Sequence, residues 1–201
     1  MRRLGLAALL AATLTACGGD ETEPGASGGA AMPTTPVKRS GPVPDGWTIK
    51  ATRYFSFAHP ADWTVTQDAV PGDTPGEVVF EVRGRETTPG LPPDVIVGAT
   101  PRYTSGLEGL LTVNDADAQV RFRDRRVIKE EKPDVPGAIG ARLIEADTPN
   151  KAPDGAVSTV RQFDLVALSE SNTAVNLFVQ VPAGEAESSR VREVVKTLEV
   201  R

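Results

Sequence analysis

The chain has 201 residues, a length typical of one domain with an additional tail, and 39% hydrophobic and 24% charged residues, as in globular proteins. Aromatic residues make up only 5%, which disfavours a deep aromatic-lined pocket. With Arg2 and Arg3 of the N-terminal segment set aside, 20 basic residues face 27 acidic ones, a net charge of −7. This acidic balance disfavours general nucleic-acid binding and adsorption to anionic lipid.

Residues 1–16 predict a secretory signal peptide. Arg2 and Arg3 form a short positive segment, and an apolar run from Leu4 to Thr13 follows it. The run is too short to span a bilayer as a helix. Export by a route that recognises paired arginines is an alternative, although only Met1 precedes the pair.

Directly after the apolar run, the residues Leu14-Thr15-Ala16-Cys17 resemble the bacterial lipobox. The resemblance implies that the Cys17 thiol accepts a diacylglyceryl group and becomes the new N-terminus, with small residues before it that admit the peptidase. Cys17 is the only cysteine, and a lone cysteine otherwise suggests intermolecular pairing or a free thiol. Two acyl chains give stable attachment, so the sequence predicts a lipid anchor at the outer face of the cytoplasmic membrane.

Residues 17–45 predict a flexible tether between the anchor and the domain. Gly, Ala, Pro, Thr and Ser dominate after Cys17, and no apolar periodicity appears, so the segment cannot offset its ordering entropy by burial. A disordered coil of this length spans roughly 30 Å. The Thr/Pro-rich stretch 32–36 is either a plain spacer or a site for O-linked sugar.

Residues 46–201 alternate as β-strands do, and a single α+β domain is expected there. Pro/Gly loops at 71–76 and 89–93 separate the early strands. In the later segment 174–181, one face is shared by Val175, Leu177, Val179 and Val181, and this alternation predicts a strand with one buried side. The expected strands are 47–50, 54–57, 77–83, 95–99, 140–146, a hairpin of 157–168 with 174–181, and a short terminal strand at 198–200.

Two helices are expected among these strands. The first begins at Ser105, with Glu108 at the capping-box spacing. Its apolar stripe consists of Leu107, Leu110, Leu111, Ala118 and Phe122. The last helix is expected from Glu185 to Lys196, with Val191, Val194, Val195 and Leu198 on one face. Strands and two helices without regular βαβ alternation point to the α+β class.

The segment Phe55–Trp63, with His59 and Pro60, resembles the aromatic-strand, proline and tryptophan signature of the PsbP/Mog1-like fold. The closing helix and strand, 191–200, are similar to the end of that fold. Actinobacterial lipoproteins of the LpqN type share the layout of lipobox, tether and one such domain. The resemblance implies a twisted antiparallel sheet with helices packed on its faces, and mostly accessory or binding roles. Fold alone does not fix function.

No catalytic constellation is apparent, and no cofactor is expected. His59 is the only histidine, so a catalytic triad would have to be built on it and a site with several histidines is excluded. A structural role at a strand end is favoured over a ligand or base role. The pairs Asp115 with Asp117 and Glu130 with Glu131 are interpreted as solvated surface, because their spacings point the carboxylates apart.

The basic residues Arg121, Arg123, Arg125 and Arg126 are the candidate surface patch, with Lys129 beside them. Such a patch would suit anionic lipid heads or acidic envelope polymers. The plainer interpretation is a helix end carrying the cations that its dipole favours, beside a solvated strand edge.

Two further features could serve binding or could be purely structural. Trp47 and Trp63 are either core packing or a stacking surface. The segment Asp147–Gly155 is either a connection or a recognition loop.

Three functions therefore remain in view. The first is a non-enzymatic, membrane-anchored binding or accessory module in the cell envelope, with a protein partner and no nucleic acid. The second is a carrier or sensor of an apolar, lipid-like ligand, which requires a continuous apolar cavity of several hundred Å³. A hydrolase is the least favoured, and the chain is expected not to be an enzyme.

Overall fold

A computed structural model describes residues 43–71, 78–86, 88, 91–151, 155, 157–187 and 190–201. The predicted signal peptide, the lipobox with Cys17 and the tether up to residue 42 lie outside these residues. No helix in the described part is both long and apolar enough to cross a membrane. The elements are β1 (Trp47–Ala51), β2 (Phe55–Pro60), β3 (Thr64–Pro71), β4 (Val78–Arg83), β5 (Asp94–Thr100), α1 (Gly106–Arg121), β6 (Arg126–Glu131), β7 (Ala138–Lys151), β8 (Val157–Ser169), β9 (Ala174–Pro182), a 3-10 turn (Ala183–Glu185), α2 (Val191–Lys196) and β10 (Glu199–Val200).

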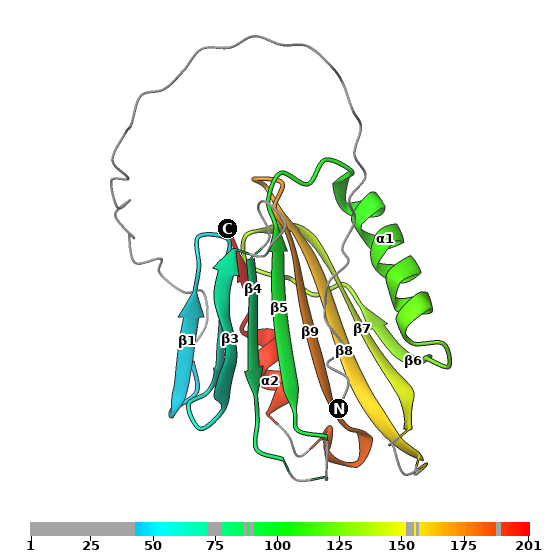
Figure 1. Cartoon of the computed structure of the whole chain (residues 1–201). Helices are drawn as coiled ribbons and strands as arrows, with labels where there is room; N and C mark the ends of the chain where they lie inside the picture. Colours follow the sequence, from blue (N-terminus) through cyan, green and yellow to red (C-terminus); the bar gives the residue numbers. More distant parts are fainter. Residues whose placement is uncertain are drawn as a thin grey trace, which may run out of the picture. The chain divides into compact units, whose positions relative to one another are not determined.

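The described strands form two antiparallel sheets. The small sheet has the order β1-β2-β10, and the large one has the order β3-β4-β5-β9-β8-β7-β6. The two helices lie on opposite faces of the large sheet, α1 in front of it in Figure 1 and α2 behind it. Antiparallel strands with helices on the sheet faces confirm the predicted α+β class.

The main core lies between the large sheet, α2 and the small sheet. On β9 the side chains of Val175, Leu177, Val179 and Val181 are at most 1% exposed, which confirms the period-2 pattern. They pack with buried residues of β2 and α2 in one cluster. The predicted hairpin is also confirmed, because β8 pairs with β9 from Val160 opposite Pro182 to Leu168 opposite Ala174.

The last helix is shorter than expected. The backbone after Pro182 forms a 3-10 turn at Ala183–Glu185, and α2 begins only at Val191. The prediction of a helix from Glu185 was therefore wrong, because acidic residues favour a helix start without fixing where it occurs. The predicted stripe is confirmed: Val191, Val194, Val195 and Leu198 are all buried in the main core.

Helix α1 begins where the sequence predicts but not by the predicted cap. Ser105 precedes its first residue, yet its side chain makes no capping hydrogen bond. Its φ of −83° and ψ of 3° place it outside the extended conformation that an N-cap serine needs, so the capping-box expectation was wrong. Leu110 and Ala118 are the buried residues of the helix, and Leu110 packs on Val166 and Leu168 of β8 in a second, smaller cluster.

Three segments differ from the sequence prediction, and the first is β6 (Arg126–Glu131), which was not among the expected strands. The strand β3, Thr64–Pro71, was not expected, and two register irregularities against β4 explain its weak alternation. The predicted loop 147–155 was wrong in its first half, because β7 continues to Lys151 and Pro149 lies opposite Thr159 of β8. Proline indicated a loop, but tertiary pairing prevailed over that local preference.

Candidate functional site

A groove of about 550 Å³, open to solvent, lies between α1 and the beginning of β7. One wall is α1, the floor is the first part of β7, and the third side is the segment that joins β6 to β7. The lining residues are Leu107, Glu108, Leu111, Thr112, Asp115, Glu130, Lys132, Pro133, Asp134, Val135, Ala138, Ile139, Gly140, Ala141 and Arg142.

The spacing of residues along α1 explains which of its side chains line the groove. Leu107, Leu111 and Asp115 recur every four residues, so they lie on one side of the helix. Leu107 and Leu111 are half-buried and pack against the smaller cluster that Leu110 joins to β8. The helix therefore covers β8 with its buried face and turns an apolar and acidic flank toward the groove.

The floor depends on a glycine. A Cβ on Gly140 would lie 2.5 Å from Cδ2 of Leu107, so a larger residue at this position would require the Leu107 side chain to move. Next to it Ile139 is 58% exposed and also lines the groove. A glycine inside a strand is a general signal of close packing, but the sequence does not identify the element that packs there.

Arg142 fixes α1 to the floor. Its Nη1 donates to Oδ2 of Asp115 at 3.0 Å, and its Nη2 lies 3.4 Å from the carbonyl oxygen of Leu111. The side chain of Arg142 is 11% exposed, whereas that of Asp115 is 43% exposed. Asp115 thus anchors the helix, which differs from the solvated role expected for it. Asp117 instead pairs with Arg121 one turn later.

The groove carries more negative than positive charge. Apart from the paired Asp115 and Arg142, its charged side chains are Glu108, Glu130, Asp134 and Lys132. All four are exposed. Glu130 is directed to the groove, while its neighbour Glu131 pairs with Lys129. Three acids against one base make this surface suitable for a cationic ligand.

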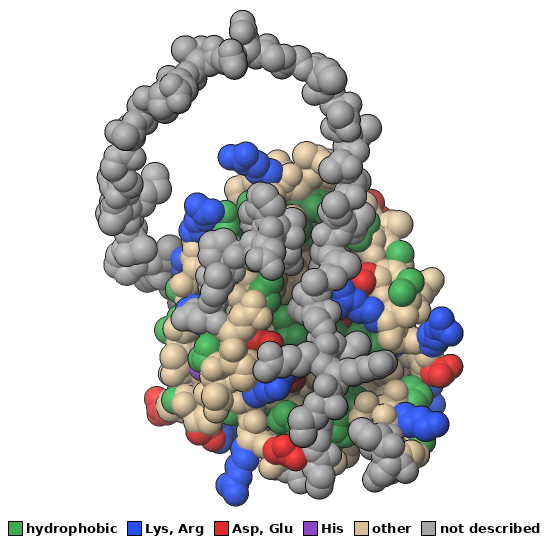
Figure 2. All heavy atoms as spheres, viewed as in Figure 1, with side chains coloured by type: hydrophobic (Ala, Val, Ile, Leu, Met, Phe, Trp, Pro, Cys, Tyr) green, Lys and Arg blue, Asp and Glu red, His purple; other side chains and the backbone are tan. Residues whose placement is uncertain are grey.

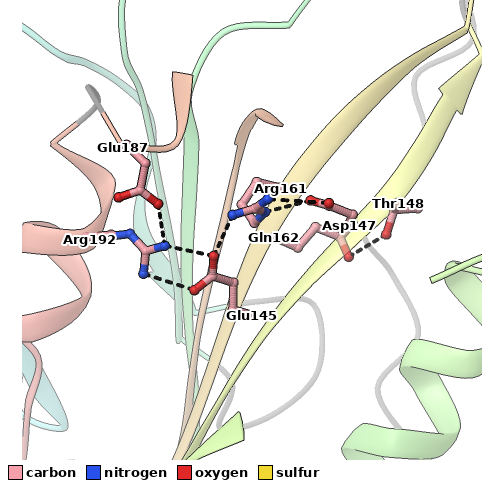
Figure 3. Close-up of polar contacts among 7 residues, drawn as sticks. All are labelled: Glu145, Asp147, Thr148, Arg161, Gln162, Glu187 and Arg192. Carbon is pink, nitrogen blue, oxygen red and sulfur yellow. Dashed lines mark hydrogen bonds and ion pairs between the residues drawn. The ribbon is translucent and has the colours of Figure 1, made fainter. Parts of the chain in front are cut away.

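On the opposite face of the large sheet, Figure 3 shows an ionic network that joins β7, β8 and α2. Glu145 is 5% exposed and accepts hydrogen bonds from Arg161 at 2.6 Å and from Arg192 at 2.8 and 2.9 Å. Asp147 accepts from Nε of Arg161 at 2.6 Å, and Arg192 also donates to Glu187.

This network has a structural role. Hydrogen bonds to Asp147 raise the pKa of Arg161, with burial opposing and Glu145 adding to the effect. Burial lowers the pKa of Arg192, but hydrogen bonds to Glu145 and Glu187 outweigh it and raise the pKa overall. Both cations therefore stay charged, and the carboxylates are held as acceptors.

His59 is 3% exposed at the end of β2. Its Nδ1 lies 2.9 Å from the carbonyl oxygen of Pro60, so Nδ1 carries the proton that this contact needs. The rings of Phe57 and Phe80 lie 5.9 and 6.2 Å from the imidazole, measured between centroids. The histidine is thus packed among aromatic side chains, away from the groove. Within the described residues, no group of three His, Cys, Asp or Glu could hold a metal ion.

The structure does not assemble the predicted basic patch as expected. Arg125 has a side chain that is only 9% exposed and lies 3.6 Å from Asp164, so it pairs with an acid of β8 and does not extend the surface patch. Arg121 is paired with Asp117, whereas Arg123 and Arg126 are exposed. Acidic and basic side chains are interspersed on the face shown in Figure 2. In the sequence Arg125 comes just after the helix, which suggested an exposed cation. Its acidic partner, Asp164, lies on β8 and becomes apparent only in the structure.

The two tryptophans pack against the main core. Trp47 and Trp63 are half-buried, and both pack against the buried residues of the main core. A Cβ on Gly84 would lie 2.9 Å from the Trp63 ring, so the glycine makes room for the indole. This contact supports the packing interpretation of Trp63.

The described part of the chain is thus an α+β domain with two antiparallel sheets, one groove beside α1 and an ionic network on the other sheet face. No protein-family model matches the chain, and no curated protein matches its sequence.

Solved structures resemble the chain in fold. LpqN, involved in cell envelope biogenesis of Mycobacterium tuberculosis, is 12% identical, with 77% of this chain and 90% of that chain covered and a TM-score of 0.49. Cyanobacterial PsbP (CyanoP) from Synechocystis is 19% identical, with 83% and 100% covered and a TM-score of 0.47. The Ran-binding protein Mog1p from Saccharomyces cerevisiae is 16% identical, with 77% and 96% covered and a TM-score of 0.44. PsbP- and Mog1-type proteins are therefore among the structures that the chain resembles, and at these values the likeness carries no functional argument.

Proposed function

We propose that this protein is a non-enzymatic lipoprotein of the cell envelope, anchored through Cys17 at the outer face of the cytoplasmic membrane, whose domain binds a protein partner. The proposed localisation is supported by the lipobox-like residues 14–17, which follow the apolar run. The binding role is supported by the groove between α1 and β7, which is the single observation that carries it.

The character of the groove favours a protein segment over an apolar ligand. A carrier for a lipid-like molecule needs an enclosed cavity with mostly apolar walls. This groove has a suitable volume, but it opens to solvent and six charged side chains line it. Charged groups at a solvent-open surface favour recognition of a polar partner, because burying them under a lipid chain would leave them without compensation.

The non-enzymatic part of the proposal is tested at His59. Because the imidazole packs against Phe57 and Phe80 and contacts Pro60, we expect His59→Gln to affect function only as far as it affects stability. Melting temperature and envelope phenotype should be measured together. A fully stable variant without function would place His59 in an active site and contradict the proposal.

Membrane attachment and partner binding are tested together in native cells. The wild-type chain should be found in the membrane fraction with a lipid mass on Cys17, and Cys17→Ala should remain unprocessed or leave the membrane. Chemical crosslinking in intact cells should give one reproducible protein adduct that the release of Cys17→Ala diminishes. An unmodified thiol on membrane protein would contradict the anchor, and an absence of any adduct would contradict the binding role.

A further inference from the structure

The floor of the groove contains a strand edge that no described strand covers. Strand β7 pairs with β8 along Ala138–Lys151, but with β6 only along Leu143–Asp147. The stretch Ala138–Arg142 therefore has a neighbour on one side only. Among the described residues, the backbone hydrogen bond of this stretch outside the sheet runs from the amide of Ala138 to the carbonyl oxygen of Val135 at 3.0 Å.

The chain leaves this edge for a physical reason. Pro133 lacks the amide that would continue the β6 ladder past Glu131. The segment then turns toward the main core, where Val135 is 6% exposed and Pro136 accepts a hydrogen bond from the amide of Val200 at 2.9 Å. This segment, Ala138–Arg142 and α1 all line the groove, which therefore lies beside the part of β7 that β6 leaves unpaired.

The groove thus combines a free strand edge with a helix beside it. An extended peptide can add to such an edge through main-chain hydrogen bonds, with alternate side chains directed to the pockets beside it. Toward α1 those side chains would meet Leu107 and Leu111, and around them the acids Glu108, Glu130 and Asp134. Lys132 is the only cation there that lacks a paired acid within the groove.

We propose that Ala138–Arg142 binds an extended segment of the partner protein as an additional strand, and that this segment carries lysine or arginine. The inference rests on the proposed function and specifies its binding site. At about 3.3 Å per residue the edge is roughly 16 Å long, so about five peptide residues pair with it. Main-chain pairing supplies affinity, and the three acids select positive side chains.

The test begins with a phage-displayed library of random twelve-residue peptides, panned against the full-length chain in detergent. Selected sequences should be rich in lysine or arginine and in β-branched residues. One selected synthetic peptide is then titrated while amide hydrogen exchange is followed by NMR. In Ile139–Arg142, the amides that point away from β8 should exchange about tenfold more slowly or less with saturating peptide, and those on the outer edge of β6, such as Ile128, should not change.

A matched pair of variants tests the selection of charge. The double variant Glu108→Lys with Asp134→Lys reverses two exposed groove acids and should weaken peptide binding by about tenfold. The control Asp124→Lys with Glu193→Lys reverses two exposed acids outside the groove and changes the net charge equally. It should leave the affinity within about twofold.

Several results would overturn the assignment. They are the selection of no binding peptide, equal weakening by both double variants, and protection at Ile128 in place of Ile139–Arg142. If the same amides slow with rising protein concentration alone, a second copy is the occupant and the peptide proposal fails. A crosslinked partner whose adduct survives Glu108→Lys with Asp134→Lys would reject the groove while leaving the proposed binding function intact.

Discussion

Glu145 of β7 and Arg192 of α2 form a two-point ion pair, with Nη1 of the arginine 2.9 Å from Oε2 and Nη2 2.8 Å from Oε1. The guanidinium also lies 4.9 Å from the centroid of the Phe163 ring. The pair joins the large sheet to the helix that closes the main core. Because Arg192 lies off the apolar stripe of the last helix, the sequence predicts an exposed side chain without effect on stability. The contact with Glu145 corrects that prediction.

Replacing Arg192 with alanine should lower the free energy of unfolding by about 1–3 kcal/mol, because the buried Glu145 loses two charge-assisted hydrogen bonds and keeps only Arg161. Urea denaturation at pH 7 measures the effect. Glu193→Ala, an exposed change in the same helix, should stay within about 0.5 kcal/mol. Equal losses in both variants would show that the ion pair contributes nothing specific.

Leu198 is 1% exposed at the end of the main core, so Leu198→Ala should cost about 2–5 kcal/mol through lost burial and the cavity left behind. Thermal and urea unfolding of the variant measure this cost. Lys196→Ala, two residues earlier and exposed, is the control and should be nearly neutral. A small effect at Leu198 would mean that the core does not depend on this residue.

Gly137 should tolerate no side chain. Its φ is +81°, and a Cβ there would lie 1.9 Å from the backbone carbonyl oxygen of Val200. We expect Gly137→Ala to destabilise by about 3 kcal/mol or more, because both backbone strain and a clash with main chain must be relieved. Gly46→Ala separates the two causes, since φ is +75° there but no atom lies within 4 Å. Its cost should be only about 1–2 kcal/mol, and equal costs would exclude the clash.

Asp94 should make the folded state less stable as the pH rises from 4 to 7. Burial raises its pKa from 3.8 to about 6, with the nearby Glu81 adding to the shift and Arg83 opposing it. Between these values the folded chain binds more protons than the unfolded chain, so the free energy of unfolding falls with pH. The contribution present below pH 3.8 is lost through pH 6 and amounts to about 2–3 kcal/mol.

The comparison that isolates this effect is Asp94→Asn, whose side chain does not ionise. Relative to the wild type, the variant should gain stability between pH 4 and pH 7, as measured by urea unfolding at each pH. Parallel stability curves for the two proteins would show that Asp94 titrates in the folded state as it does in the unfolded one.

The local sequence pattern was sufficient to predict an element where successive residues at regular spacing are all buried. The alternation of Val175 to Val181 predicted a strand with one buried face, and the spacing of Val191, Val194 and Val195 predicted a buried helix face. Both depend on backbone periodicity, which neighbouring residues carry by themselves. The start of α2 and the strand at Pro149 were missed, because the contacts that decide them lie elsewhere in the chain.

The sequence by itself determined the α+β class, the β8–β9 hairpin and the expectation of a lipid anchor at Cys17. Only the tertiary structure decided the groove, the open edge at Ala138–Arg142 and the pairing of Glu145 with Arg192, residues that lie 47 positions apart. Periodicity shows which face of an element is buried but not which element covers it. That choice depends on close packing, as where Gly140 admits Leu107, and such complementarity exists only once distant segments meet.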